Sequence, residues 1–172
     1  MIHMKTEYDL NSRLWANTDE HFFRDQKYVV VKQKNLNCVV VVLATLSGAS
    51  PDHFKGVINT QNPVSWSEAL KSWGMKLAYC PCDIRKLRYY MEELIELDDL
   101  FLLSYYTPVS KRILKDPNEN GWIGHSHIVI LHGANIYDSK FEQAVPAKKH
   151  ICNKHYTKRI FRVVPIGHDR GL

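Results

Sequence analysis

A short apolar segment, Cys38–Ser47, constrains the fold of this chain more than any other part of it. The segment reads CVVVVLATLS, and its run of consecutive valines favours a strand by propensity. Its flanks favour a helix instead, because an Asn-containing turn precedes it and Gly48 follows it in the position of a helix C-cap. Since tertiary context overrides propensity, we predict that Cys38–Ser47 is a buried helix.

Local patterns elsewhere separate the chain into early helices and late strands. Further helices are predicted from the Ser50-Pro51 start, from a capping box made by Ser65 and Glu68, and from a cap at Asp83; they span 51–58, 65–74 and 83–97. Strands are predicted at 27–33, 76–79, 100–106, 127–131, 136–138 and 159–165. This order lacks βαβ alternation and predicts an α+β fold, in which N-terminal helices pack on a C-terminal antiparallel sheet.

Two stretches of the chain are expected to be irregular. Residues 8–24 are of mixed character and predict a short helix or a turn-rich arm. Residues 107–124 are polar and contain several Pro, Asn and Gly residues, which predicts a long surface loop.

The bulk composition fits one globular domain. The chain has 172 residues, of which 45% are hydrophobic; we assign 4–172 to a single domain and expect Met1–His3 to be a cloning remnant. No stretch approaches the roughly 20 apolar residues of a membrane helix, and no secretory pattern opens the chain. Four cysteines without an export signal indicate a reducing compartment, so we expect free thiols and a cytoplasmic location.

The charge of the chain is mildly basic. Its formal net charge is +5, and the basic residues are spread along the sequence as on a solvated surface. A nucleic-acid binder concentrates its Lys and Arg residues on one stripe. The composition therefore argues against nucleic acid as a partner.

One cysteine lies where a nucleophile would be activated. Cys38 opens the predicted buried helix, where the helix dipole stabilises a thiolate and free backbone N–H groups face an oxyanion. His127 opens the apolar strand 127–131, and Asp138 follows the next hairpin turn. Antiparallel strands joined by a tight turn bring their outer ends together, so Asp138 is placed to orient the imidazole of His127. His125 remains an alternative to His127 as the base.

The same residues carry a resemblance to a known family. Asn37-Cys38, the apolar run up to Gly48 and the following Ser50-Pro51 resemble the nucleophile helix of papain-like cysteine peptidases, most closely the compact bacterial and phage members. The stretch from Ser126-His127 through Asp138 resembles the histidine hairpin of that family, and the order Cys, His, Asp is kept.

The resemblance implies a fold and a chemistry. It implies a papain-like α+β fold and a cysteine hydrolase that cleaves a peptide, isopeptide or amide bond in a peptide or protein, without a cofactor. Cys38 would be the nucleophile, His127 the base and Asp138 the orienting group. Gln33, with Asn37 as another candidate, would hold the oxyanion.

The sequence allows two other interpretations. The first is a catalytically inactive papain-like fold that binds or inhibits another protein. The second is a zinc site made by Cys80-Pro81-Cys82 and the stretch from His150 to His155. A single residue between the two cysteines is tighter than the usual spacing of zinc ligands, and the two groups lie far apart in sequence, so no metal is predicted.

Overall fold

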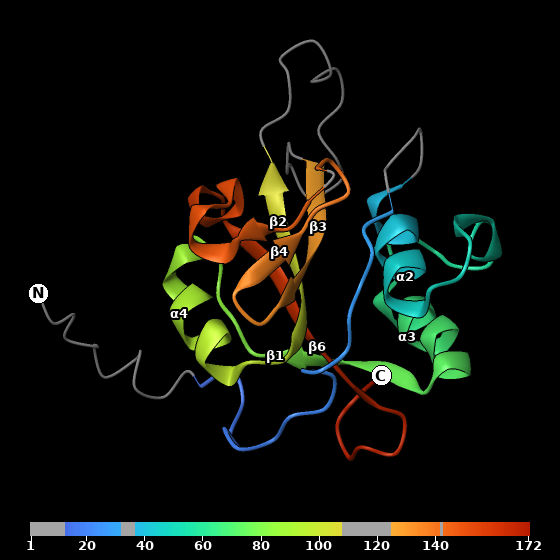
Figure 1. Ribbon diagram of the computed structural model, residues 1–172, viewed down its shortest axis with the longest axis horizontal. Coiled ribbons are helices and arrows are strands. Elements are labelled where there is room, and N and C mark those ends of the chain that lie inside the picture. Colours follow the sequence, from blue (N-terminus) through green and yellow to red (C-terminus); the bar gives the residue numbers. More distant parts are fainter. Residues whose placement is uncertain (1–12, 32–36, 108–124, 142) are drawn as a thin grey trace, which may run out of the picture.

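An antiparallel sheet forms the middle layer of the fold (Figure 1). The computed structural model describes residues 13–31, 37–107, 125–141 and 143–172. Within them the sheet has six strands in the order β1-β6-β2-β3-β4-β5. Their bounds are Met75–Cys80 (β1), Leu100–Thr107 (β2), His125–His132 (β3), Asn135–Tyr137 (β4), Val145–Pro146 (β5) and Thr157–Pro165 (β6).

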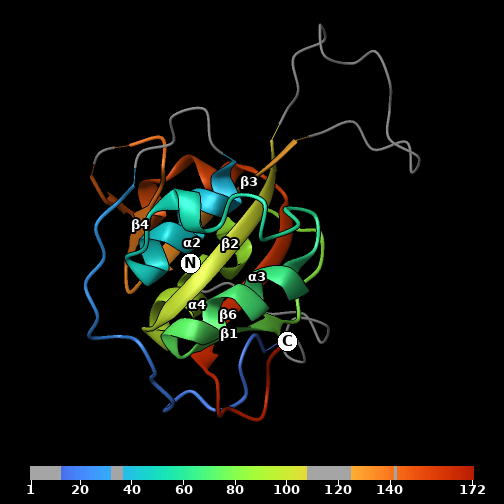
Figure 2. The same ribbon diagram turned by 90° about the vertical axis from the view of Figure 1, so that its right-hand side faces the viewer.

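Helices cover both faces of this sheet, as Figures 1 and 2 show. One face carries α2 (Cys38–Ser47), η1 (Pro51–His53), α3 (Pro63–Leu70) and η2 (Lys71–Trp73). The other carries α4 (Arg88–Leu97), η3 (Ala147–Lys149) and η4 (Ile151–Lys154). Each helical layer shares an apolar core with the sheet, so the predicted α+β arrangement of helices on an antiparallel sheet is confirmed.

The predicted buried helix is confirmed as α2. The side-chain oxygen of Asn37 accepts the backbone N–H of Val39 at 2.8 Å and caps the start of the helix. Gly48 ends it in the left-handed region at φ 74°, where its N–H bonds to the carbonyl of Ala44. Every residue from Val39 to Leu46 is buried. Burial on all sides therefore outweighs the strand propensity of the valines.

The predicted strand at 27–33 is wrong for its described part. Residues 27–31 have no strand partner, and 32–33 lie outside the described residues. The backbone N–H of Val31 donates instead to the Thr45 hydroxyl at 3.4 Å, and Tyr28 packs on the core beneath α2. Tyr28 and Val31 pack against the core that contains α2, whereas Val29 is 84% exposed.

Two predicted helix starts are also wrong. Asn62, not Ser65, caps α3; the Ser65 hydroxyl bonds to the backbone of Asn59 and Asn62 instead. The helix predicted from Asp83 begins only at Arg88, because the residues before it are tied to the start of β6 through backbone bonds such as Thr157 N–H to Arg85 C=O.

Other predicted elements agree more closely with the structure. Ser50 caps η1 as predicted, although η1 ends at His53 and is shorter than the predicted helix 51–58. The described part of the predicted arm 8–24 consists of turns and bends. The predicted loop 107–124 lies outside the described residues except for Thr107, which ends β2. In the part of the chain that the structure describes, no helix is both long enough and apolar enough to cross a membrane.

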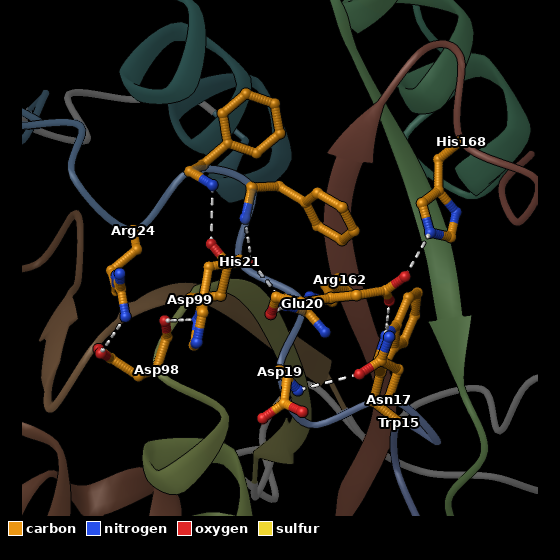
Figure 3. A network of polar contacts seen from close by, with 12 residues as sticks. Trp15, Asn17, Asp19, Glu20, His21, Arg24, Asp98, Asp99, Arg162 and His168 are labelled. Carbon is orange, nitrogen blue, oxygen red and sulfur yellow. Dashed lines mark hydrogen bonds and ion pairs between the residues drawn. The ribbon is translucent and has the colours of Figure 1, made fainter.

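A buried ion pair ties the N-terminal arm to the sheet (Figure 3). Arg162 of β6 and Asp99, which directly precedes β2, are both inaccessible at their side chains, and Arg162 Nη2 donates to Asp99 Oδ2 at 2.7 Å. The same carboxylate accepts the backbone N–H groups of Phe22 and Phe23, each at 2.8 Å. The guanidinium of Arg162 also lies 4.6 Å from the ring centre of Trp15. These contacts hold the arm in place without a strand or helix.

Candidate active site

Cys38 occupies the first position of α2 and is half-buried. Burial by itself raises the pKa of its thiol. A hydrogen bond and the charge of His127, together with the backbone N–H groups of Ile128 and Val39, act in the opposite direction. The net result is a pKa below that of an ordinary cysteine, which favours the nucleophilic thiolate.

His127 lies between Cys38 and Asp138. It stands on β3 opposite Tyr105 of β2, whose ring packs edge-on at 5.8 Å, and only 5% of His127 is exposed. Its Nε2 lies 2.8 Å from Asp138 Oδ1, which leaves Nδ1 for the thiol. Burial lowers the pKa of His127, but the bonds to Asp138 and Cys38 raise it to about 9. The raised pKa of His127 therefore favours a protonated imidazole, whose charge stabilises the thiolate form of Cys38.

Asp138 follows β4 and is 1% exposed. The β3–β4 hairpin, with His132 opposite Asn135 and Ile130 opposite Tyr137, returns the chain so that residues 11 apart in sequence meet. Burial raises the pKa of Asp138, but hydrogen bonds from His127, from His150 and from the backbone N–H of Lys140 hold it well below its usual range. The carboxylate is thus a fixed, ionised acceptor.

His150 also bonds to Asp138, and the sequence did not single it out for this role. Its Nε2 lies 2.8 Å from Asp138 Oδ2, and its Nδ1 accepts the backbone N–H of Cys152 at 3.0 Å. His150 joins η3 to η4 within a polar stretch that has no periodicity. The sequence suggests His150 only as a candidate zinc ligand. Its contact with Asp138 joins residues 12 apart in a polar stretch without a local pattern, so the sequence carries no signal for it.

The other predicted site residues, Gln33, Asn37 and His125, are described only in part. Gln33 lies outside the described residues. Asn37 is exposed, and its Oδ1 is engaged in capping α2, so its oxyanion role stays a prediction. For His125, only the backbone is described, in β3 opposite Thr107. Among the histidine side chains that the structure describes, His127 is the one that lies beside Cys38.

The remaining cysteines differ from Cys38. Cys80, Cys82 and Cys152 are free thiols whose pKa values are all raised by burial, to about 12 for Cys80 and Cys152. Among the described residues, no group of three or more His, Cys, Asp or Glu side chains is arranged to hold a metal ion. The low thiol pKa of Cys38 therefore distinguishes it from the other three cysteines.

Alkylation should report this difference directly. We expect iodoacetamide to label Cys38 with an apparent pKa well below the roughly 8.5 of a free thiol. In His127→Ala the apparent pKa should rise, because the hydrogen bond and the charge of His127 that oppose burial are lost. Labelling is followed against pH with assignment of each cysteine by mass spectrometry, and Cys82 is the internal control. An unchanged Cys38 profile in His127→Ala would contradict the pair.

No protein-family model and no curated protein matches this chain. Among solved structures, it is similar to the crystal structure of the peptidase domain of Streptococcus ComA, a bi-functional ABC transporter involved in a quorum-sensing pathway. The similarity covers 81% of this chain and 99% of that chain, at 16% sequence identity and a TM-score of 0.47. In this chain, a buried helix opens with Cys38 and packs on the antiparallel sheet that carries His127.

Proposed function

We propose that this protein is a cysteine hydrolase that cleaves a peptide, isopeptide or amide bond through Cys38, His127 and Asp138. One observation carries the proposal: the buried imidazole of His127 hydrogen-bonds to the Asp138 carboxylate at 2.8 Å and lies close enough to Cys38 to lower the pKa of its thiol. Acyl transfer requires a nucleophile beside a base, and an orienting group on the other side of that base.

The chemistry follows from these contacts. His127 takes the proton of Cys38, and the thiolate attacks the carbonyl carbon of the scissile bond. The start of α2, with its helix dipole, stabilises the tetrahedral oxyanion. The imidazolium of His127 then protonates the leaving amine, and a thioester to Cys38 remains. His127 next takes a proton from water, the hydroxide attacks the thioester, and the acid and the thiol are released.

The substrate and the location follow from the same features. The chemistry favours a peptide or protein as substrate and needs no cofactor. A thiolate nucleophile has to stay reduced, and the chain holds three further free thiols. We therefore place the protein in a reducing compartment such as the cytoplasm.

Peptide cleavage tests the proposal. The parent and Cys38→Ala are incubated with a library of peptides from a digested proteome, and new termini are counted by mass spectrometry. We expect cleavage by the parent to be lost in Cys38→Ala and kept in Cys82→Ala. Its rate should rise with deprotonation of Cys38, below the pKa of a free thiol, and fall as His127 loses its proton near pH 9.

The opposite outcome is equally specific. If the parent cuts no peptide, or if Cys38→Ala cuts as fast as the parent, the hydrolase proposal fails. The chain would then be studied as an inactive papain-like fold that binds or inhibits another protein.

A further inference from the structure

We propose that His150 is a positioning residue, which holds Asp138 ionised and oriented so that Asp138 in turn orients His127. This inference rests on the proposed function, because it assigns a fourth member to the same site. His150 does not contact Cys38 in the described contacts; it bonds to the far oxygen of the carboxylate that His127 uses. The contact is closed to solvent, since the side chains of His150 and Asp138 are each 1% exposed.

The protonation of His150 can be read from its partners. A backbone N–H can only donate, so the Nδ1 of His150 that accepts the Cys152 N–H at 3.0 Å carries no proton. The proton of the neutral ring is then on Nε2, which faces Asp138 Oδ2 at 2.8 Å. His150 is thereby fixed as a donor toward Asp138 by a backbone bond at the start of η4.

This donor decides what Asp138 can do. A carboxylate that accepts N–H groups on both oxygens is held in its ionised form and in one rotamer. Oδ1 accepts from His127 and from the backbone of Lys140, and Oδ2 accepts from His150. Without His150, Oδ2 would be a buried acceptor that has lost its imidazole donor, and Asp138 would protonate at higher pH or rotate away from His127.

The surroundings leave few other groups to replace His150. Among the described residues, five titratable groups on neighbouring elements face the Asp138–His150 pair: His127 on β3, Tyr105 on β2, Cys152 on η4, His155 after η4, and Lys140 in the loop after β4. Tyr105 and Cys152 are buried, and burial raises the pKa of each, so both remain neutral at neutral pH. Lys140 contributes its backbone N–H to Asp138 Oδ1, not to Oδ2.

Three variants test this role. His150→Leu removes the donor, and His150→Gln restores an N–H at a similar distance along the side chain. His155→Leu is the matched control, since it removes an imidazole that lies five residues further along and stacks on Tyr105 without a bond to Asp138. The measurements are the pH profile of Cys38 alkylation, the peptide cleavage rate, and the tautomer of His150 in the parent by ¹⁵N NMR.

The expected results are specific. The acid limb of Cys38 alkylation should move up by about one pH unit in His150→Leu, so that labelling at pH 6 slows by about tenfold. His150→Gln should recover most of this shift, and His155→Leu should leave the profile unchanged. The parent spectrum should show the proton of His150 on Nε2.

Two results would overturn the inference. One is a folded His150→Leu variant with the parent's alkylation profile. The other is a parent spectrum with the His150 proton on Nδ1, a measurement that needs no variant to fold. If peptide cleavage is absent in the parent while the alkylation shift appears, the hydrolase proposal fails and the positioning role stands. If cleavage occurs and the shift is absent, the positioning role fails alone.

Discussion

Replacing Asp138 with Asn is expected to slow the alkylation of Cys38 at pH 6 by about 100-fold. Both carboxylate oxygens accept an imidazole N–H, one from His127 and one from His150. An amide offers one oxygen and one NH2 group, so one of the two imidazoles must present an unprotonated Nε2. His150 resists this change because its Nδ1 already accepts the N–H of Cys152.

The rearrangement therefore falls on His127. Its proton moves to Nδ1, so the nitrogen that faces Cys38 has no lone pair with which to take the thiol proton. The neutral amide also removes the charge that stabilises the imidazolium. We expect the pKa of Cys38 to rise and peptide cleavage to fall by about 10³–10⁴-fold.

The measurement is the alkylation profile together with cleavage rates, after far-UV circular dichroism has established that the variant is folded. Asp25→Asn is the matched control, because it makes the same change at a side chain that is 97% exposed. If Asp138→Asn keeps more than a tenth of the parent's labelling rate at pH 6, Asp138 does not orient His127.

Replacing Asp99 with Asn is expected to lower the free energy of unfolding by about 3 kcal/mol or more. Asp99 accepts three donors at once: the guanidinium of Arg162 and the backbone N–H groups of Phe22 and Phe23. An amide turns one of these acceptors into a donor and leaves the charge of Arg162 buried without a counter-ion. Nε and Nη1 of Arg162 already lack hydrogen-bond partners among the described contacts. No neighbouring acceptor there replaces the lost carboxylate charge.

Urea denaturation measures this loss, with the midpoint compared at constant slope. Asp98→Asn is the matched control: its side chain is half exposed and pairs with Arg24 only at 3.7 Å, and Asn tolerates the left-handed backbone at φ 48°. We expect Asp98→Asn to change the free energy of unfolding by less than about 1 kcal/mol. Equal losses in the two variants would contradict the buried pair.

Much of the site could be predicted because its parts carry local signals. Cys38 lies between a capping Asn and an apolar run that a glycine ends, and His127 and Asp138 flank one hairpin turn. Such signals depend on neighbours within a few residues. The α+β layout was predictable for the same reason, since the order of helices and strands is local.

The missed features depend on contacts between distant residues. Asp99 and Arg162 are 63 residues apart, and nothing near either of them shows that the other is its partner. Arg162 is inaccessible although it lies in the strand 157–165, where a charged residue would ordinarily face solvent. The valines of residues 27–31 favour a strand by propensity, but Val31 packs against the core that contains α2 and Val29 is exposed.

The buried Asp99–Arg162 ion pair and the candidate active site lie toward opposite ends of the same strands. Asp99 precedes β2 at one end, whereas Tyr105, six positions later, lies opposite His127. At about 3.3 Å per residue this separates them by roughly 20 Å. Effects of changes that far apart add nearly independently. Substitutions around Asp99 and Arg162 can therefore change the free energy of unfolding, and substitutions around His127 can change the reactivity of the Cys38 thiol. Each set leaves the other property nearly unchanged.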